Sequence, residues 1–202
     1  MMVDEKLTWE EHINYLCNKL CKLRYAFRSL SAFIDKEMVK QLYFGYVYPH
    51  IAYGIELYGT ACKRFLKRLQ SMQNMLLKTL ARKQFRYDTI KLHDELELLQ
   101  ISEIHKFSIC MFVYKHKMGM LPSIFKDYFN LNRDFRDRTT RQDNNLYAIK
   151  SRTIQGSKTV QYIGARYWNN LPDNIKKTTY LSTFKKSCKR HYLFSYKGNP
   201  AI

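Results

Sequence analysis

Apolar residues recur at alternating steps of three and four near the start of the chain, and this repeat constrains the fold more than any other feature. The repeat consists of Ile13, Leu16, Leu20, Leu23, Phe27 and Leu30. This spacing puts every member on one side of an α-helix, so the segment predicts a long amphipathic helix that packs on a partner helix. Thr8 and Glu11 have the spacing of a capping box, which predicts that the helix begins at Trp9.

Three later segments have the same helical pattern. Asp35 is expected to cap a helix through residues 38–43, and Ser102 is expected to cap one through residues 104–118. Residues 63–82 form the third segment, whose apolar side consists of Phe65, Leu69, Met72, Leu76 and Leu80. The protein is therefore expected to be mainly α-helical.

A proline interrupts the aromatic segment between these helices. Pro49 is expected to hold Tyr48 out of helical geometry, so residues 47–58 should contain a kink or a break. The segment is rich in tyrosine: Tyr43, Tyr46, Tyr48, Tyr53 and Tyr58. We interpret these as buried rings whose hydroxyl groups find partners at the edge of the core, and a platform that stacks nucleic-acid bases is the alternative.

Composition supports the helical class and separates the two ends of the chain. Seven glycines and four prolines in 202 residues argue against all-β folds, which need many tight turns. Residues 1–130 contain 20 basic and 13 acidic residues, whereas residues 131–202 contain 15 and 4. We expect a helical domain at 1–128, a basic linker at 129–145 and a small basic α+β domain at 146–202. In this last domain, residues 152–155 and 159–163 are expected to pair as a short β-hairpin before a final helix at 182–194.

Positive charge dominates the chain. The formal net charge is +18, which favours a polyanionic partner such as nucleic acid. On the helix at 63–82, the side opposite the apolar residues forms a basic ridge, Lys63, Arg64, Lys67, Lys78 and Arg82, accompanied by Gln70, Ser71 and Asn74. A second candidate set for phosphate contacts is Arg138, Arg141, Arg152, Lys185 and Lys186. The alternative interpretation of the ridge is an ordinary solvated face.

Residues for catalysis or metal binding are not grouped in the sequence. A two-metal polymerase or nuclease site needs paired carboxylates, and the nearest cluster, Asp94, Glu95 and Glu97, fits the early turns of a helix. Cys17 and Cys21 have helical spacing, but we favour packing over metal binding because no second ligand pair accompanies them. We therefore expect no catalytic residues, no metal and no cofactor.

The first twelve residues and the hydropathy of the chain bear on its location. The opening, MMVDEKLTWEEH, carries acidic residues where a secretory signal peptide has basic and then apolar residues. No run of about 18 apolar residues is present, and five cysteines are an odd number better interpreted as reduced thiols. An intracellular protein of the cytoplasm or nucleus, without a membrane partner, is expected.

Several segments, in order, resemble one family. Residues 3–13, VDEKLTWEEHI, resemble the passage from palm to thumb in reverse transcriptases of non-LTR, LINE-like retrotransposons of the jockey type. Residues 48–59, YPHIAYGIELYG, and 67–74 are similar to the thumb motif and the helix after it. Residues 138–141 are similar to the Asn-Thr-Arg segment of the family, with Arg138 and Thr139 replacing its usual lead-in. The strongest match is 164–175, GARYWNNLPDNI, which together with TFKK at 183–186 resembles the family's Trp-Asn-x-Leu-Pro and Phe-Lys signature.

The resemblance implies a thumb-like helical domain that contacts template RNA or an RNA:DNA duplex. In the family, the aspartates that bind metal precede the part that residue 1 matches, and the zinc knuckle of some members is absent here. The chain is therefore expected to be a nucleic-acid-binding fragment of an RNA-directed DNA polymerase, without activity of its own. The alternative is a helical protein–protein interaction module, which includes self-association through exposed helical seams. Trp168 is interpreted as a core residue rather than a base-stacking one.

Overall fold

The computed structural model describes residues 1–135 and 145–195. The chain forms two compact units, Met1–His105 and Lys106–Ile202, and the division falls inside one helix, earlier than the predicted end of the helical domain at 128. Within the described residues, regular structure is helical apart from one isolated antiparallel bridge between Leu131 and Leu146. The prediction of a mainly α-helical protein is confirmed.

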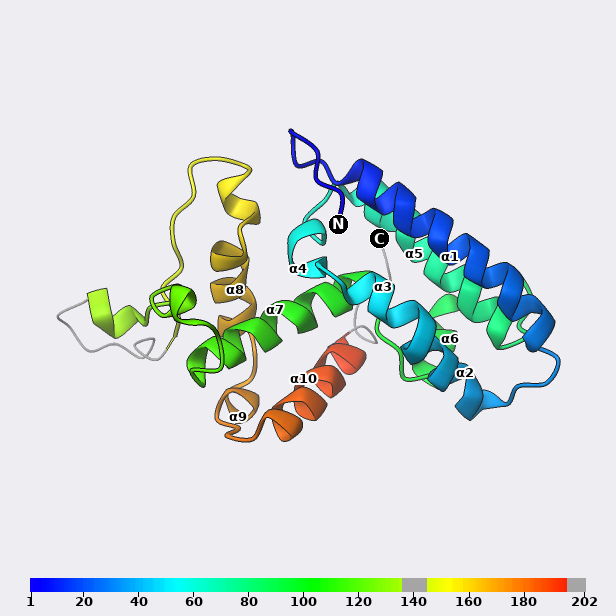
Figure 1. The fold of residues 1–202 in the computed structure, drawn as a ribbon. Helices are drawn as coiled ribbons and strands as arrows, with labels where there is room; N and C mark the ends of the chain where they lie inside the picture. The colour runs from blue at the N-terminus through cyan, green and yellow to red at the C-terminus, as the bar shows by residue number, and fades with distance from the viewer. Residues whose placement is uncertain (136–144, 196–202) are drawn as a thin grey trace. The chain divides into compact units, whose positions relative to one another are not determined.

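The helices of the first unit are shown in Figure 1. They are α1 (Glu10–Leu30), α2 (Lys36–Leu42), the π-helical turn η1 (Tyr43–Val47), α3 (Tyr48–Ala52), α4 (Ile55–Tyr58), α5 (Lys63–Leu80) and α6 (Thr89–Glu95). Helix α7 (Ile101–Lys117) runs from the first unit into the second.

The second unit contains the remaining helices. They are the 3₁₀ turns η2 (Ser123–Phe125), η3 (Asn132–Phe135) and η4 (Gly156–Lys158), followed by α8 (Val160–Asn169), α9 (Asp173–Lys176) and α10 (Leu181–Ser195). Its core includes a stack of the Tyr114 and Phe184 rings, whose centroids are 4.1 Å apart. Trp168 lies 5.8 Å from the Phe184 ring and is only 2% exposed, so it is a core residue as predicted.

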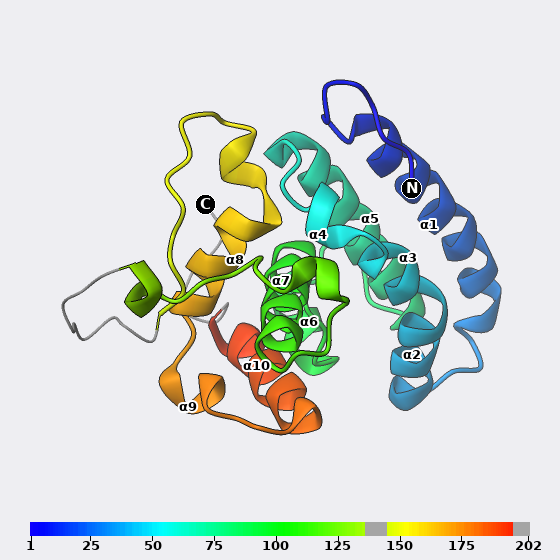
Figure 2. The ribbon, with the colours of Figure 1, turned by 60° about the vertical axis from the view of Figure 1, so that its left-hand side comes forward.

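Helices α1 and α5 lie side by side in both views of the ribbon (Figures 1 and 2). The Arg68 guanidinium donates to Asn14 Oδ1 at 2.6 Å, and Arg24 Nε donates to Thr79 Oγ1 at 3.2 Å. Asn14 comes before Arg24 in α1, and their partners Arg68 and Thr79 follow the same order in α5. The two helices are therefore parallel. The predicted apolar side of α1 is buried at Ile13, Leu16, Leu20 and Phe27. Leu23 is half-buried and Leu30 is 46% exposed, so the predicted side is buried over most of its length and open at its end.

The start of α1 differs from the predicted capping box. The carboxylate of Asp4 binds this segment in place of the predicted cap. It accepts from the backbone nitrogens of Thr8 and Trp9 at 2.8 and 2.7 Å. Trp9 takes a left-handed conformation with φ 63°, and the Thr8 hydroxyl accepts only a long 3.4 Å contact from Glu10 N. The helix begins at Glu10. By contrast, the predicted cap of α2 is confirmed, since Asp35 Oδ1 accepts from Met38 N at 2.8 Å.

The predicted effect of Pro49 on its neighbour is wrong. Tyr48 is helical, with φ −56° and ψ −42°, because Pro49 lies in the first turn of α3, where its missing N–H is not needed. The break comes later in the segment. Tyr53 is extended and Gly54 has φ 73°, a left-handed conformation that favours glycine.

The predicted hairpin in the C-terminal domain is also wrong, since a 3₁₀ turn and a helix take its place. The Thr159 hydroxyl accepts from Tyr162 N at 3.3 Å and caps α8. The Ser157 hydroxyl donates to Ile154 O at 2.7 Å, which closes the preceding turn. Thr159 lies here at a helix N-cap, a position that favours hydroxyl residues, although threonine is also common in strands.

Candidate nucleic-acid interface

Helix α5 has one buried side and one open side. The buried residues are Leu69, Gln73, Leu76, Leu77 and Leu80. Lys63, Arg64 and Lys67 are exposed on the opposite side, as the sequence predicts, and Arg68 is exposed beside them. The four residues lie within the first two turns of the helix, and we call them the α5 basic cluster.

The α5 basic cluster lies at the positive end of the helix dipole. Cations at this end oppose the dipole, which makes them unfavourable for the helix and favourable for an anion placed there. The first turn of α5, which the structure describes completely, contains no acidic residue. Arg64 lies 5.3 Å from the centroid of the Phe65 ring. The region is a concentrated positive surface that can contact phosphate groups.

The other end of the predicted ridge is built differently. Lys78 is half-buried, and its Nζ donates to Phe85 O at 2.7 Å while lying 5.7 Å from the Phe85 ring. Arg82 follows the end of α5 with φ 52° and lines a hollow of about 290 Å³. The ammonium group of Lys78 therefore binds the backbone that follows the helix. The predicted basic ridge from Lys63 to Arg82 is not continuous.

Two polar residues that were expected beside the ridge point to the interior instead. Gln70 Nε2 donates to Asn74 Oδ1 at 2.8 Å, and Gln70 Oε1 accepts from Ile101 N at 2.8 Å. Gln73, which is fully buried, donates to Tyr43 Oη at 2.8 Å and to Leu99 O at 3.0 Å. Their partners are distant in the sequence, so helical spacing alone did not reveal this network.

His93 completes the buried network, and the sequence reasoning missed it. Its Nε2 lies 2.9 Å from Asn74 Oδ1 and its Nδ1 lies 3.1 Å from Leu98 O. Burial lowers the pKa of His93 to about 4, against the opposing effect of the hydrogen bond to Leu98. The ring is therefore neutral near pH 7, and its contacts with Asn74 and Leu98 link two segments of the first unit.

The five tyrosines divide between core and surface. Tyr43 and Tyr58 are buried, and burial raises the pKa of each phenol. The Tyr43 hydroxyl accepts from Gln73, and that of Tyr58 donates to Ile51 O. Tyr46 and Tyr53 are exposed. Burial with satisfied hydroxyls thus holds for part of the set only.

The second candidate set belongs to the second unit. Arg152, Lys185 and Lys186 are exposed there, the two lysines on α10. Arg138 and Arg141 lie outside the described residues. Residues 106–202 contain 19 basic and 5 acidic residues, against 16 and 12 in residues 1–105. Most of the positive charge therefore belongs to the second unit.

The acidic cluster near α6 has partners within the first unit. Glu95 pairs with Lys83 at 3.2 Å and accepts from the Tyr87 hydroxyl, and Glu97 pairs with Lys40 at 2.9 Å. The hydrogen bond from Tyr87 and the pairing with Lys83 lower the pKa of Glu95. Across the residues that the structure describes, no group of three or more His, Cys, Asp or Glu side chains is placed to hold a metal ion.

Two further findings complete the description of the chain. A helix with the length and apolar character needed to cross a membrane is not found within 1–135 and 145–195. Comparisons with protein-family models, with curated proteins and with solved structures found no match to this chain.

Proposed function

We propose that this protein binds RNA or an RNA:DNA duplex through the phosphate backbone, with the α5 basic cluster as the contact surface. The observation that carries the proposal is the gathering of Lys63, Arg64 and Lys67 at the exposed, dipole-positive end of one helix, beside Arg68, whose guanidinium donates to Asn14 Oδ1. Each Lys or Arg that replaces a condensed counterion adds a favourable, salt-dependent contribution to binding. The proposal assigns no reaction to the chain.

The choice of RNA rests on the resemblance described above. Residues 3–13, 67–74 and 164–175 resemble the thumb region and downstream signature of LINE-like reverse transcriptases. This supports a fragment of an RNA-directed DNA polymerase, in which the thumb-like helices contact template RNA or its duplex with DNA. The excess of basic residues in the second unit supports further backbone contacts from Arg152, Lys185 and Lys186.

The test replaces three residues of the α5 basic cluster. It keeps Lys78, whose ammonium group donates to Phe85 O. The triple variant Lys63→Gln, Arg64→Gln and Lys67→Gln should fold normally, because all three side chains face away from the buried side of α5. Its affinity for a short RNA:DNA duplex should fall by roughly tenfold or more at low salt. The slope of log affinity against log salt should shrink by about 0.9 per lost contact. Fluorescence anisotropy over a salt series measures both quantities.

The matched control removes the same number of charges from the second unit. The variant Arg152→Gln, Lys185→Gln and Lys186→Gln should weaken binding less than the α5 variant does. Binding of both variants should change equally for all duplex sequences, since phosphate contacts carry no base information. If the α5 variant binds with unchanged affinity and slope while the control loses binding, the α5 cluster is an ordinary solvated surface.

A protein–protein interaction module is the second candidate, and exposed aromatic rings favour it. Phe33 is 85% exposed and Phe85 is 81% exposed in the first unit. Apolar contacts hold or strengthen as salt rises, whereas phosphate contacts weaken. Sedimentation of the protein alone over the same salt series separates the two: salt-resistant self-association that Phe33→Ser and Phe85→Ser abolish supports the second candidate.

A further inference from the structure

The second unit contains a hollow of about 770 Å³ beside α9. It is formed where α7 and α8 end and by the length of α9, and we call it the α9 hollow. Of the described residues that line it, four are cationic and one is acidic: Lys117, Arg133, Lys176 and Lys177 against Asp173. A concave surface with one sign of charge concentrates its field and attracts an anion of the opposite sign.

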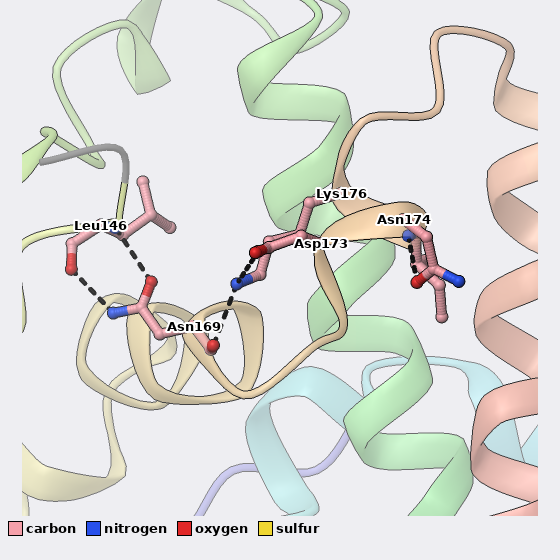
Figure 3. A network of polar contacts seen from close by, with 6 residues as sticks. Leu146, Asn169, Asp173, Asn174 and Lys176 are labelled. Atoms are coloured by element: carbon pink, nitrogen blue, oxygen red, sulfur yellow. Dashed lines mark hydrogen bonds and ion pairs between the residues drawn. The ribbon is translucent and has the colours of Figure 1, made fainter. Parts of the chain in front are cut away.

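The acidic residue of the α9 hollow is paired with a lysine of the same helix. Asp173 Oδ1 lies 3.3 Å from Lys176 Nζ, which also donates to Asn169 O at 3.0 Å (Figure 3). The Lys176 side chain is only 13% exposed, whereas that of Asp173 is 81% exposed, so the lysine belongs to the wall and the carboxylate lies at the surface. Within the described part of the chain, Lys117 and Lys177 form no ion pair, and Arg133 forms a long, exposed contact of 3.8 Å with Asp134. Three cations therefore remain for a ligand.

Two hydrogen bonds join the segments that form the wall of the α9 hollow. The side-chain amide of Asn169 binds both backbone polar groups of Leu146. Its Oδ1 accepts from Leu146 N and its Nδ2 donates to Leu146 O, each at 2.9 Å (Figure 3). Leu171 and Trp168 are buried, and Lys117 Nζ lies 5.6 Å from the Trp168 ring.

We propose that the α9 hollow binds the phosphate of a nucleotide, with Lys117, Arg133 and Lys177 as its ligands. Lysine and arginine are the cations that proteins use for phosphate, and the volume lies in the range of small-molecule sites. Leu131 and Pro172 line the same hollow and provide apolar surface for a sugar and a base. The phosphate belongs either to a free nucleotide or to the end of a strand. The choice of a nucleotide over other phosphates rests on the proposed function.

The experiment titrates the full chain with three probes by calorimetry. They are adenosine 5′-monophosphate, a short 5′-phosphorylated oligoribonucleotide, and adenosine, which lacks the phosphate. The double variant Lys117→Gln and Lys177→Gln should weaken binding of the phosphorylated probes by about tenfold or more, because both altered residues line the hollow. Lys126→Gln with Lys150→Gln is the matched control, with the same loss of charge on exposed residues of the second unit that do not line the hollow. It should change the affinity by less than about twofold. Arg133→Gln replaces the double variant if thermal melting shows that the latter does not fold.

The outcomes separate the two ligand sources and the two proposals. Binding of both phosphorylated probes that the double variant weakens supports a site for any nucleotide phosphate. Binding of the oligoribonucleotide alone, weakened by the same double variant, supports a strand end. Equal binding of adenosine, or equal weakening by the control variant, overturns the inference. If neither phosphorylated probe binds while the RNA:DNA duplex does, the α9 hollow is not a phosphate site and the proposed function stands. If the probes bind but the duplex does not, the proposed function fails and the phosphate site remains.

Discussion

At the scale of single residues, the buried amide network of the first unit decides which side chains of α5 face inward. Gln73 and Gln70 satisfy backbone groups of Leu99 and Ile101 that would otherwise be buried without partners. An unsatisfied buried polar group costs about 1–3 kcal/mol, so these glutamines stabilise the junction between α5 and the start of α7. His93 belongs to the same network through Asn74.

His93 makes the stability of the protein depend on pH. The pKa of its ring is about 4 in the folded state against 6.5 in the unfolded chain, so the unfolded state binds the proton first as pH falls. The free energy of unfolding should therefore drop by about 3 kcal/mol between pH 6.5 and pH 4 on account of this residue. Urea denaturation over that range measures the loss, and the variant His93→Gln should lack it. His12, whose pKa burial also lowers, is unchanged in both proteins. Parallel pH profiles of the two proteins would contradict the prediction.

At the scale of secondary-structure elements, a glycine sets how closely α8 packs in the second unit. A Cβ added at Gly164 would lie 2.8 Å from the Phe129 ring and 3.2 Å from Val113 Cγ2, on α7. The absence of a side chain at this position therefore allows the close approach. The resemblance to a family signature begins at this glycine, and the contact gives it a physical role.

Gly164→Ala should destabilise the protein although alanine favours helices. Overpacking a buried site costs about 1–3 kcal/mol, whereas the gain in helix propensity is about 1 kcal/mol. The expected net loss, by chemical denaturation, is up to about 2 kcal/mol. Gly45→Ala is the matched control on η1, because a Cβ there meets no described atom within 4 Å. It should leave the stability unchanged or raise it slightly. A loss in the control equal to that of Gly164→Ala would defeat the packing argument.

At the scale of the whole molecule, charge is distributed unevenly. The first unit, residues 1–105, has a net charge of +4 and residues 106–202 have +14. Like charges on a compact protein repel one another, and salt screens that repulsion over a Debye length of about 10 Å at 0.1 M. The charge balance therefore opposes folding most strongly in the second unit.

Salt should stabilise the protein in the absence of nucleic acid. The melting temperature, followed by calorimetry, is expected to rise as sodium chloride is raised from low to moderate concentration, because screening reduces the self-repulsion of a +18 chain. The variant Lys185→Glu with Lys186→Glu lowers the formal charge to +14 and should show a smaller rise. A melting temperature that is independent of salt in both proteins would show that ion pairs, rather than net repulsion, dominate.

The sequence by itself determined the helical class, the orientation of α5 and the cap of α2. These features depend on residues within a few positions of one another. The repeat of three and four places Leu69, Leu76 and Leu80 on one side of the helix, whatever packs against it. A cap such as Asp35 needs a partner only three residues away. Local chemistry of this kind can be read along the chain.

Only the tertiary structure decided which basic residues are available to a ligand. Lys78 was predicted to belong to the ridge, but the carbonyl of Phe85 binds its ammonium group. Lys117, Arg133 and Lys177 lie far apart in the sequence and meet only around the α9 hollow. A residue's charge follows from its identity, whereas its partners and its neighbours in space follow from contacts between segments that no local pattern specifies. The helices could thus be predicted from short-range spacing, and the grouping of charges could not.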